Sequence, residues 1–363
     1  MAKKVFIAAT RQNDGKTSVS LGLFKSFSKR FDRMAYMKPV GQQYRLIDGE
    51  KIDKDAVLFK DVYALPHPLQ DMSPIAVPSG FTEHYIQSPQ KNVLSQRITT
   101  AYSRLQESAD CVLIEGTGHG GVGSVFDMSN ADVAQLLGAK VVLVTLGGIG
   151  KAIDELLLNK AFFESRGSTI AGVIINKVET EKFEKIKKIL SIALSRHNLP
   201  ILGMIPFVTL LTKPTVAELY EEFSAELLGG KSGLSNQVEQ FVIGAMLPHD
   251  AIDYFKQGTL LIVPANREDL ILTALCGSLL DKKGQFDVSA IIFTGGIRPH
   301  PTLSHVIENS KIPTMLVKED SFSVATKINK MLFKLRAEEK SKIEMIQTLI
   351  ESHVLVDQIC EMI

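Results

Sequence analysis

The chain has 363 residues, of which 45% are hydrophobic and 22% are charged, and its 41 Lys and Arg residues nearly balance its 40 Asp and Glu residues. This length predicts roughly two domains, each large enough to bury its own core. The charge balance excludes a polybasic nucleic-acid-binding protein, and no apolar run approaches the ~18 residues of a membrane span, so we expect neither nucleic-acid nor membrane partners. Cys111, Cys276 and Cys360 form no metal-binding or disulfide pattern, which favours the reducing cytoplasm.

Short apolar runs alternate with helical patterns along the first part of the chain. The predicted strands are Lys4–Ala8, Met34–Lys38, Asp110–Ile114, Val141–Thr145, Ile170–Ile175 and Ile201–Met204. The predicted helices are Lys16–Phe27, Gln90–Glu107, Asn130–Leu137, Ala152–Arg166 and Glu181–Arg196. Because the strands are continuously apolar rather than alternating, we expect an α/β fold with a parallel sheet and helices on both faces.

A domain boundary is predicted where the periodicity stops. A helix over Pro214–Leu228 is followed by Gly229-Gly230-Lys231-Ser232-Gly233, which favours a first domain of residues 1–228, a linker of 229–238 and a smaller α/β domain of 239–363. In the second domain we expect four strands, Phe241–Ala245, Thr259–Pro264, Val288–Phe293 and Thr314–Val317. The expected helices there are Glu268–Leu280, Ser323–Ala337 and a single closing helix, Lys340–Ile363.

The segment between the first strand and the first helix has the layout of a P-loop. In such loops the backbone N–H groups at the start of the helix bind phosphate oxygens. Lys16 would reach the β- and γ-phosphates of ATP, the Thr17 hydroxyl would bind Mg²⁺, and Gly15 would let the backbone approach the anion. Thr10 replaces the first glycine of the usual pattern, and a chance Gly-Lys-Thr is the alternative, but the position after an N-terminal strand favours nucleotide binding. The candidate nucleotide ligands of the loop are Asn13, Gly15, Lys16, Thr17 and Ser18.

Further charged residues follow other predicted strands. Lys38 ends the second strand, and because parallel strands deliver their carboxyl ends to one edge, Lys38 and Lys16 are the candidate catalytic residues. Glu115 directly follows a buried strand, which is typical of a Walker-B acid that binds Mg²⁺; a loop-capping acid is the alternative. Asp53 and Asp55 both begin a helical pattern, and their spacing does not decide which of them would join Glu115.

A competing motif lies in Gly116–Gly121, which reads G-x-G-x-x-G. No helix is predicted to open at Gly121, and the next strand has no acid for a ribose hydroxyl, so a dinucleotide site is disfavoured. His119, within this stretch, is either a substrate contact or an ordinary loop residue.

Together these residues resemble the dethiobiotin synthetase-like branch of P-loop proteins, which includes the cobyrinic acid synthases. The resemblance rests on the loop ending in Gly15-Lys16-Thr17, on Lys38-Pro39-Val40, on Asp55-Ala56-Val57 and on Glu115 to Gly118. It implies that Thr17, Asp55 and Glu115 bind Mg²⁺ and that Asn176 contacts adenine. It also implies ATP-dependent activation of a carboxylate or carbamate, although Gly41-Gln42-Gln43-Tyr44 departs from the substrate loop of dethiobiotin synthetase itself.

A second resemblance covers almost the whole chain. The order of these motifs, followed by Pro214 to Leu219, is similar to the N-terminal region of long bacterial phosphotransacetylases, and Asn266–Leu272 and Ile291–Gly296 resemble the DRTGG domain that follows there. The acetyltransferase domain would need a longer chain, so we do not expect a complete phosphate acetyltransferase. The alternative to an enzyme is a regulatory nucleotide sensor that acts as a homo-oligomer or through a partner.

The second half also contains a candidate ligand site. Arg267 opens a helix after one strand, and Thr294-Gly295-Gly296 closes another, so both turns should flank one crevice at the carboxyl ends of the strands. The arginine and the glycines would suit an anion, while a dimer interface is the competing role.

Overall fold

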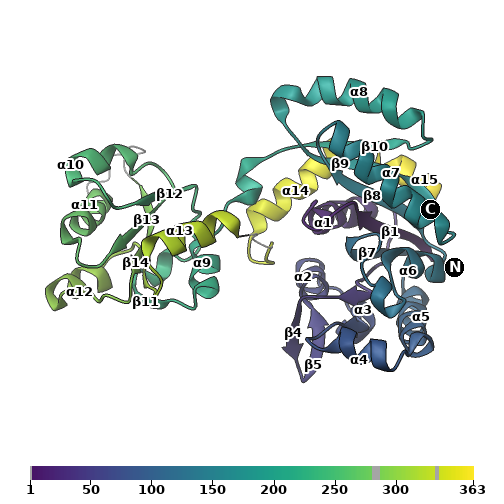
Figure 1. The fold of residues 1–363 in the computed structure, drawn as a ribbon, viewed down its shortest axis with the longest axis horizontal. Helices are drawn as coiled ribbons and strands as arrows, with labels where there is room; N and C mark the ends of the chain where they lie inside the picture. The colour runs from purple at the N-terminus through teal and green to yellow at the C-terminus, as the bar shows by residue number, and fades with distance from the viewer. Residues whose placement is uncertain (1, 280–286, 332–334) are drawn as a thin grey trace. The chain divides into compact units, whose positions relative to one another are not determined.

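The computed structural model describes residues 2–279, 287–331 and 335–363, and it divides into two compact units (Figure 1). The first unit comprises Met1–Val208 together with Leu335–Ile363, and the second comprises Thr209–Lys334. Within the described ranges, no helix combines the length and the apolar character that crossing a bilayer requires.

The first unit is built on a parallel sheet of six strands. Their order is β10-β9-β8-β1-β7-β2, and every neighbouring pair is parallel. The strands are β1 (Lys3–Ala9), β2 (Met34–Met37), β7 (Cys111–His119), β8 (Lys140–Leu146), β9 (Ile170–Val178) and β10 (Ile201–Pro206). Their central residues are fully buried, as in Val141 to Val144 of β8, so the prediction of a sheet covered on both faces is confirmed.

Five predicted helices of this unit are also present. They are α1 (Lys16–Phe27), α5 (Lys91–Ser108), α6 (Asn130–Leu137), α7 (Gly150–Ser165) and α8 (Phe183–Ser195). The region between β2 and α5 contains α2 (Lys54–Tyr63), where the sequence shows a helical pattern that begins at Asp53 and Asp55. It also contains small elements that the sequence pattern did not reveal, because such short segments carry too little periodicity. These are β3 (Val40–Gly41), β4 (Tyr44–Ile47), β5 (Glu50–Asp53), α3 (Leu69–Met72), β6 (Ile75–Ala76) and α4 (Phe81–Gln87).

Strand β7 is longer than expected. The glycine-rich stretch after Glu115 continues the strand instead of forming a loop, and His119 still pairs with Ala9 of β1. The side chain of Asn130 stabilises this extension, because its amide nitrogen donates to the carbonyls of Thr117 and His119 and its oxygen accepts the N–H of Thr117.

The C-terminal segment forms two helices instead of the single helix predicted. Helices α14 (Lys340–His353) and α15 (Val356–Met362) are separated by Val354, which is extended, and Leu355, whose N–H donates to Leu202 O on edge strand β10 at 2.7 Å. Helix α14 packs along α1 (Figure 1). The two helices approach closely at Gly22, where any Cβ would overlap the side chain of Ile350.

The second unit contains a five-stranded sheet in the order β11-β15-β14-β13-β12. Its strands are β11 (Glu226–Gly229), β12 (Gln240–Ile243), β13 (Thr259–Pro264), β14 (Val288–Thr294) and β15 (Thr314–Leu316); β11 is antiparallel to β15, and the other pairs are parallel. Its helices are α9 (Val216–Glu222), α10 (Pro248–Ala251), α11 (Glu268–Leu279), α12 (Pro301–Glu308) and α13 (Ser321–Lys330). Successive residues of the central strands point into two separate cores, one on each face of the sheet.

The structure divides the chain at other positions than those expected for the domains. Instead of one helix over Pro214–Leu228, the chain forms α9 and then β11, and both belong to the second unit because β11 pairs with β15. The helix expected over Ser323–Ala337 ends at Lys330, and residues 332–334 lie outside the described part of the chain. For the helix expected over Glu268–Leu280, the last residue, Leu280, also lies outside the described part. Helices α14 and α15, expected in the second domain, complete the first unit.

Candidate functional site

The loop between β1 and α1 is closed by its own side chains. The Thr10 hydroxyl donates to Asp14 Oδ2 at 2.8 Å, and the N–H of Arg11 donates to the same oxygen at 2.9 Å. Burial raises the pKa of the Asp14 carboxyl, although these two hydrogen bonds oppose the effect. Thr10 therefore replaces the usual glycine with a side chain that helps to fix the loop.

Gly15 ends this loop at a position that only glycine fits. Its φ is +92°, and a Cβ there would overlap the amide nitrogen of Asn176. Asn176 Nδ2 donates to Asp14 O at 2.9 Å, and Lys177 Nζ donates to Asn13 O at 3.2 Å. In this structure Asn176, which the resemblance assigned to adenine, supports the backbone of the loop. Ser18 lies in the first turn of α1.

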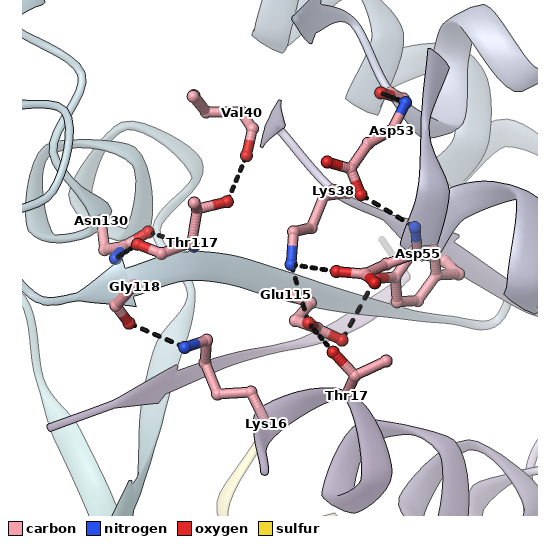
Figure 2. Close-up of polar contacts among 12 residues, drawn as sticks. Lys16, Thr17, Lys38, Val40, Asp53, Asp55, Glu115, Thr117, Gly118 and Asn130 are labelled. Carbon is pink, nitrogen blue, oxygen red and sulfur yellow. Dashed lines mark hydrogen bonds and ion pairs between the residues drawn. The ribbon is translucent and has the colours of Figure 1, made fainter. Parts of the chain in front are cut away.

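Glu115 lies at the centre of the polar cluster that follows the loop (Figure 2). It is fully buried on β7, and its Oε1 accepts from the Thr17 hydroxyl at 2.9 Å and from Lys38 Nζ at 2.7 Å. Its Oε2 accepts from the Tyr36 hydroxyl at 3.1 Å. Lys38 Nζ also donates to Asp55 Oδ2 at 2.8 Å. The structure thus brings together Thr17, Lys38, Asp55 and Glu115 from α1, the end of β2, α2 and β7.

The two aspartates that the sequence left open have different positions. Asp53 is the N-cap of α2, where its Oδ1 accepts the N–H of Asp55 at 2.9 Å. The carboxylate of Asp55 faces Lys38 instead, and both side chains are buried. Asp55 is therefore in direct contact with Lys38, and Asp53 adds to the negative charge around that ammonium.

The two lysines of the site have opposite electrostatic surroundings. Burial, together with the nearby charge of Lys38, lowers the pKa of Lys16 to about 8, and Lys16 Nζ donates to Gly118 O at 2.7 Å. Burial alone would also lower the pKa of Lys38, but the charges of Asp55 and Glu115 outweigh it and hold that pKa above the ordinary value. Lys38 is therefore firmly charged at neutral pH, whereas Lys16 titrates close to it.

The oxygen atoms around Glu115 suit a hard divalent cation. Among the residues that the structure describes, no three His, Cys, Asp or Glu side chains gather as a metal cluster, so the candidate set is two carboxylates and the Thr17 hydroxyl. Mg²⁺ commonly takes only one or two protein carboxylates and completes its shell with water and phosphate oxygens. The donors Thr17, Asp55 and Glu115 fit that chemistry.

Two contributors to the site carry no sequence motif. Tyr36 is buried on β2, and burial together with Glu115 raises the pKa of its phenol well above the usual value, so it remains a neutral donor to Glu115. Asn130 begins α6 and holds the glycine-rich end of β7, where a Cβ on Gly116 would overlap its side-chain oxygen. Only the positions of these residues in the folded chain reveal their roles.

In the second unit, Arg267 binds protein oxygens. Its Nη1 donates to Gly244 O at 3.0 Å and its Nη2 to Met246 O at 2.8 Å, and it forms an ion pair with Asp269 at 2.9 Å. These contacts tie the loop after β12 to the start of α11. They give Arg267 a structural role at the sheet edge where an anion site was expected.

The other candidates of the second unit follow the neighbouring strand. The hydroxyl of Thr294 lies 2.8 Å from Ser321 Oγ. Gly295 and Gly296 have φ values of +72° and +65°, and the N–H of Gly295 donates to Glu319 O at 2.7 Å. Because β13 and β14 are adjacent and parallel, these residues and Arg267 share the carboxyl edge of the sheet, as predicted.

Two protein-family models match the chain. One, described as an AAA domain, matches residues 3–215, and the other, described as a DRTGG domain, matches residues 218–331. The two matched regions meet close to the division between the units, which falls between residues 208 and 209.

Curated relatives align with almost the whole chain. It is 28% identical over 373 residues to the phosphate acetyltransferase of Nitratidesulfovibrio vulgaris, covering 98% of this chain and 51% of that protein. It is 26% identical over 354 residues to the phosphate acetyltransferase of Deinococcus radiodurans, covering 94% of this chain and 48% of that protein. The chain thus spans about half the length of the curated relatives that it matches.

Two solved structures align with parts of this chain. The septum site-determining protein MinD from Pyrococcus horikoshii, complexed with Mg-ADP, covers 58% of this chain and 84% of its own, with 17% identity and a TM-score of 0.36. The CBS and DRTGG domains of a Clostridium perfringens pyrophosphatase, complexed with diadenosine tetraphosphate, cover 40% of this chain and 69% of their own, with 17% identity and a TM-score of 0.28.

Proposed function

Because the chain belongs to the AAA domain family of P-loop proteins and also carries a DRTGG domain, we propose that its first unit binds Mg·ATP. The contacts of Thr17 and Lys38 with the buried carboxylate of Glu115, and of Lys38 with Asp55, carry this proposal. Lys16 would bind the phosphate oxygens, and Thr17, Asp55 and Glu115 would hold the metal. The backbone from Asn13 to Ser18 would surround the phosphates, with Asn176 supporting the loop from behind.

The reaction that fits this site best is phosphoryl transfer to a carboxylate or carbamate. The γ-phosphorus would lose its bond to the β-phosphate oxygen and gain one to the acceptor oxygen, leaving ADP and a mixed anhydride. Bound Mg²⁺ neutralises the charge of the phosphates in such reactions. Lys16 and Lys38 would stabilise the charge that develops on the transferred group, because both are buried at the same sheet edge.

A second candidate function is regulation by the bound nucleotide. The second unit is inserted between β10 and α14, and α14 packs along α1, the helix that begins with Lys16 and Thr17. A protein that senses ATP needs such a link between its nucleotide loop and its other unit. In this function the chain would act as a homo-oligomer or on a partner, without consuming a substrate.

Calorimetric titration with Mg·ATP tests the premise that the two candidates share. We expect saturable heat from the wild-type protein and none from Lys16→Ala, while Lys60→Ala, a lysine of α2 whose ammonium binds the carbonyls of Leu65 and His67, retains the wild-type affinity. No heat from the wild-type protein would refute both functions.

Incubation with ATP, bicarbonate and a metabolite pool separates the two candidates. Phosphate or ADP formed in proportion to one consumed metabolite supports the enzyme. A change in oligomer mass by light scattering on adding Mg·ATP, without product formation, supports the regulator.

A further inference from the structure

The ammonium of Lys38 occupies the point where the candidate metal ligands meet. Its Nζ lies 2.7 Å from Glu115 Oε1 and 2.8 Å from Asp55 Oδ2, and the Thr17 hydroxyl binds the same Glu115 oxygen (Figure 2). The two carboxylates assigned to the cation therefore already contact a positive charge that belongs to the chain itself.

Burial makes this charge necessary. Glu115 is 0% exposed, Asp55 is 5% exposed and Lys38 is 4% exposed, and two buried carboxylates without a counter-charge would be strongly unfavourable. Lys16, the other buried lysine of the site, donates to the carbonyl of Gly118, and its charge adds to the positive charge near Glu115 and Asp55. Without a divalent cation, the ammonium of Lys38 contacts both carboxylates and offsets their charge.

A divalent cation and Lys38 compete for the same atoms. Mg²⁺ binds carboxylate oxygens at about 2.0–2.1 Å. The repulsion between the ion and an ammonium held on the same two oxygens would be large in a buried site. Lys38 is attached to the chain by four methylenes, so its ammonium can leave these oxygens while its backbone stays in place.

We propose that Lys38 is the internal counter-ion of the metal site: it neutralises Asp55 and Glu115 until a divalent cation displaces it, and this displacement releases its ammonium for an anionic ligand. The inference rests on the proposed function, because it takes Asp55 and Glu115 as metal ligands. It adds an order of events, in which Lys38 reaches the phosphate or acceptor group only after the metal has arrived. Metal binding and anion binding are then coupled through one side chain.

Mn²⁺ binding without nucleotide, measured by electron paramagnetic resonance, tests the displacement. Lys38→Met removes the charge and keeps a side chain of similar reach, so it should bind Mn²⁺ at least tenfold more tightly than the wild-type protein. Lys16→Met is the matched control, because it removes a buried positive charge from the same site without freeing a carboxylate. Its gain should be much smaller. Equal gains in the two variants, or no gain in Lys38→Met, would overturn the proposal.

The double variant Lys38→Met with Glu115→Gln should lose the gain in Mn²⁺ affinity. A retained gain would mean that the extra Mn²⁺ binds elsewhere, and it would contradict the proposal.

Reductive methylation of the wild-type protein gives a readout that does not depend on a folded variant. Lys38, which is buried, should be methylated several times faster in saturating Mg²⁺ than in EDTA, as measured by mass spectrometry, and an unchanged rate would also contradict the proposal. Titration of the same samples with ATP shows which of the two proposals fails. If ATP binds but neither the gain in Mn²⁺ affinity nor the change in methylation rate is seen, only the counter-ion proposal is refuted. If both effects are seen but ATP does not bind, only the proposed nucleotide function is refuted.

Discussion

The charge of Lys16 should make nucleotide affinity depend on pH. Burial, assisted by the charge of Lys38, lowers the pKa of Lys16 to about 8, and only the ammonium form attracts phosphate oxygens. At that pKa about nine-tenths of Lys16 is charged at pH 7 and about one-tenth at pH 9. The free protein must then be protonated before it binds, so affinity should fall roughly tenfold between these pH values, or about 1.4 kcal/mol.

Calorimetry with Mg·AMPPNP at pH 7 and pH 9 measures this change directly. Lys16→Arg is the control, because a guanidinium stays charged over the whole range, and any change it shows comes from the ligand or from other groups. A wild-type affinity that changes no more than that of Lys16→Arg would refute the assignment of a titrating lysine to the loop.

The same pKa affects stability with the opposite sign. The pKa of Lys16 is about 8 in the folded chain against 10.5 for an ordinary lysine, so charged Lys16 destabilises the fold below pH 8 and the penalty disappears as the pH rises to 10.5. The full difference corresponds to roughly 3 kcal/mol. Below pH 8, Lys16→Met should therefore melt at a higher temperature than the wild-type protein, and this difference should become smaller as the pH rises above 8. A difference that stays constant with pH would contradict the low pKa of Lys16.

Three further substitutions probe separate parts of the structure. Gly15→Ala should destabilise the loop by about 1–3 kcal/mol and abolish the heat of Mg·ATP binding, because its backbone φ is +92° and its new Cβ would overlap Asn176. Adding Asn176→Ala should relieve only the overlap. An unchanged titration of Gly15→Ala would contradict this loop geometry. Ile350→Ala should cost about 2–5 kcal/mol in denaturant unfolding of the first unit, since Ile350 is buried against Gly22 of α1; a loss under 1 kcal/mol would mean that α14 adds little there. Arg267→Met should lower the melting temperature of the second unit by a few degrees without changing Mg·ATP binding, and a changed affinity would show that Arg267 acts on the nucleotide site.

The layered fold was predictable because its strands are buried on both faces. A run such as Val141 to Val144 cannot alternate between core and solvent, and it therefore identifies a central parallel strand. Helix α1 has the predicted limits, Lys16 and Phe27, since its start follows a glycine with positive φ. These signals are local in the sequence. The parts of the fold that were predicted wrongly depend on contacts between residues that are distant in the sequence.

The glycine-rich run at Gly229–Gly233 shows how a local signal can mislead. It looks like a linker, but a Cβ on Gly229 would overlap the carbonyl of Ile307, and one on Gly230 would overlap the backbone of Ile312. The glycines are present because other segments pack directly on this backbone. Composition alone does not distinguish a glycine that permits flexibility from one that permits close packing.

The candidate site was only partly predictable for a similar reason. Strand order places Lys38 and Glu115 side by side, because Lys38 follows β2 and Glu115 lies on the neighbouring parallel strand β7. The choice of Asp55 over Asp53 came from a resemblance, and the structure supplies the physical difference: one caps α2 and the other faces Lys38. Tyr36 completes the hydrogen bonds of Glu115 from inside a strand, where an aromatic residue ordinarily indicates only core packing.

The connection between the units bears on the choice between the two candidate functions. A regulator must transmit the state of its phosphate loop to its other unit, and helix α1 carries Lys16 at one end and the contact of Gly22 with Ile350 along its side. Helix α14 packs along α1 and follows the second unit in the chain, and this connection along the chain is the path that the proposed regulator would use. An enzyme that only activates a small acid needs no such path. Because the C-terminal helices complete the first unit and do not extend the inserted one, this connection is compatible with the proposed regulation of the second unit by bound nucleotide.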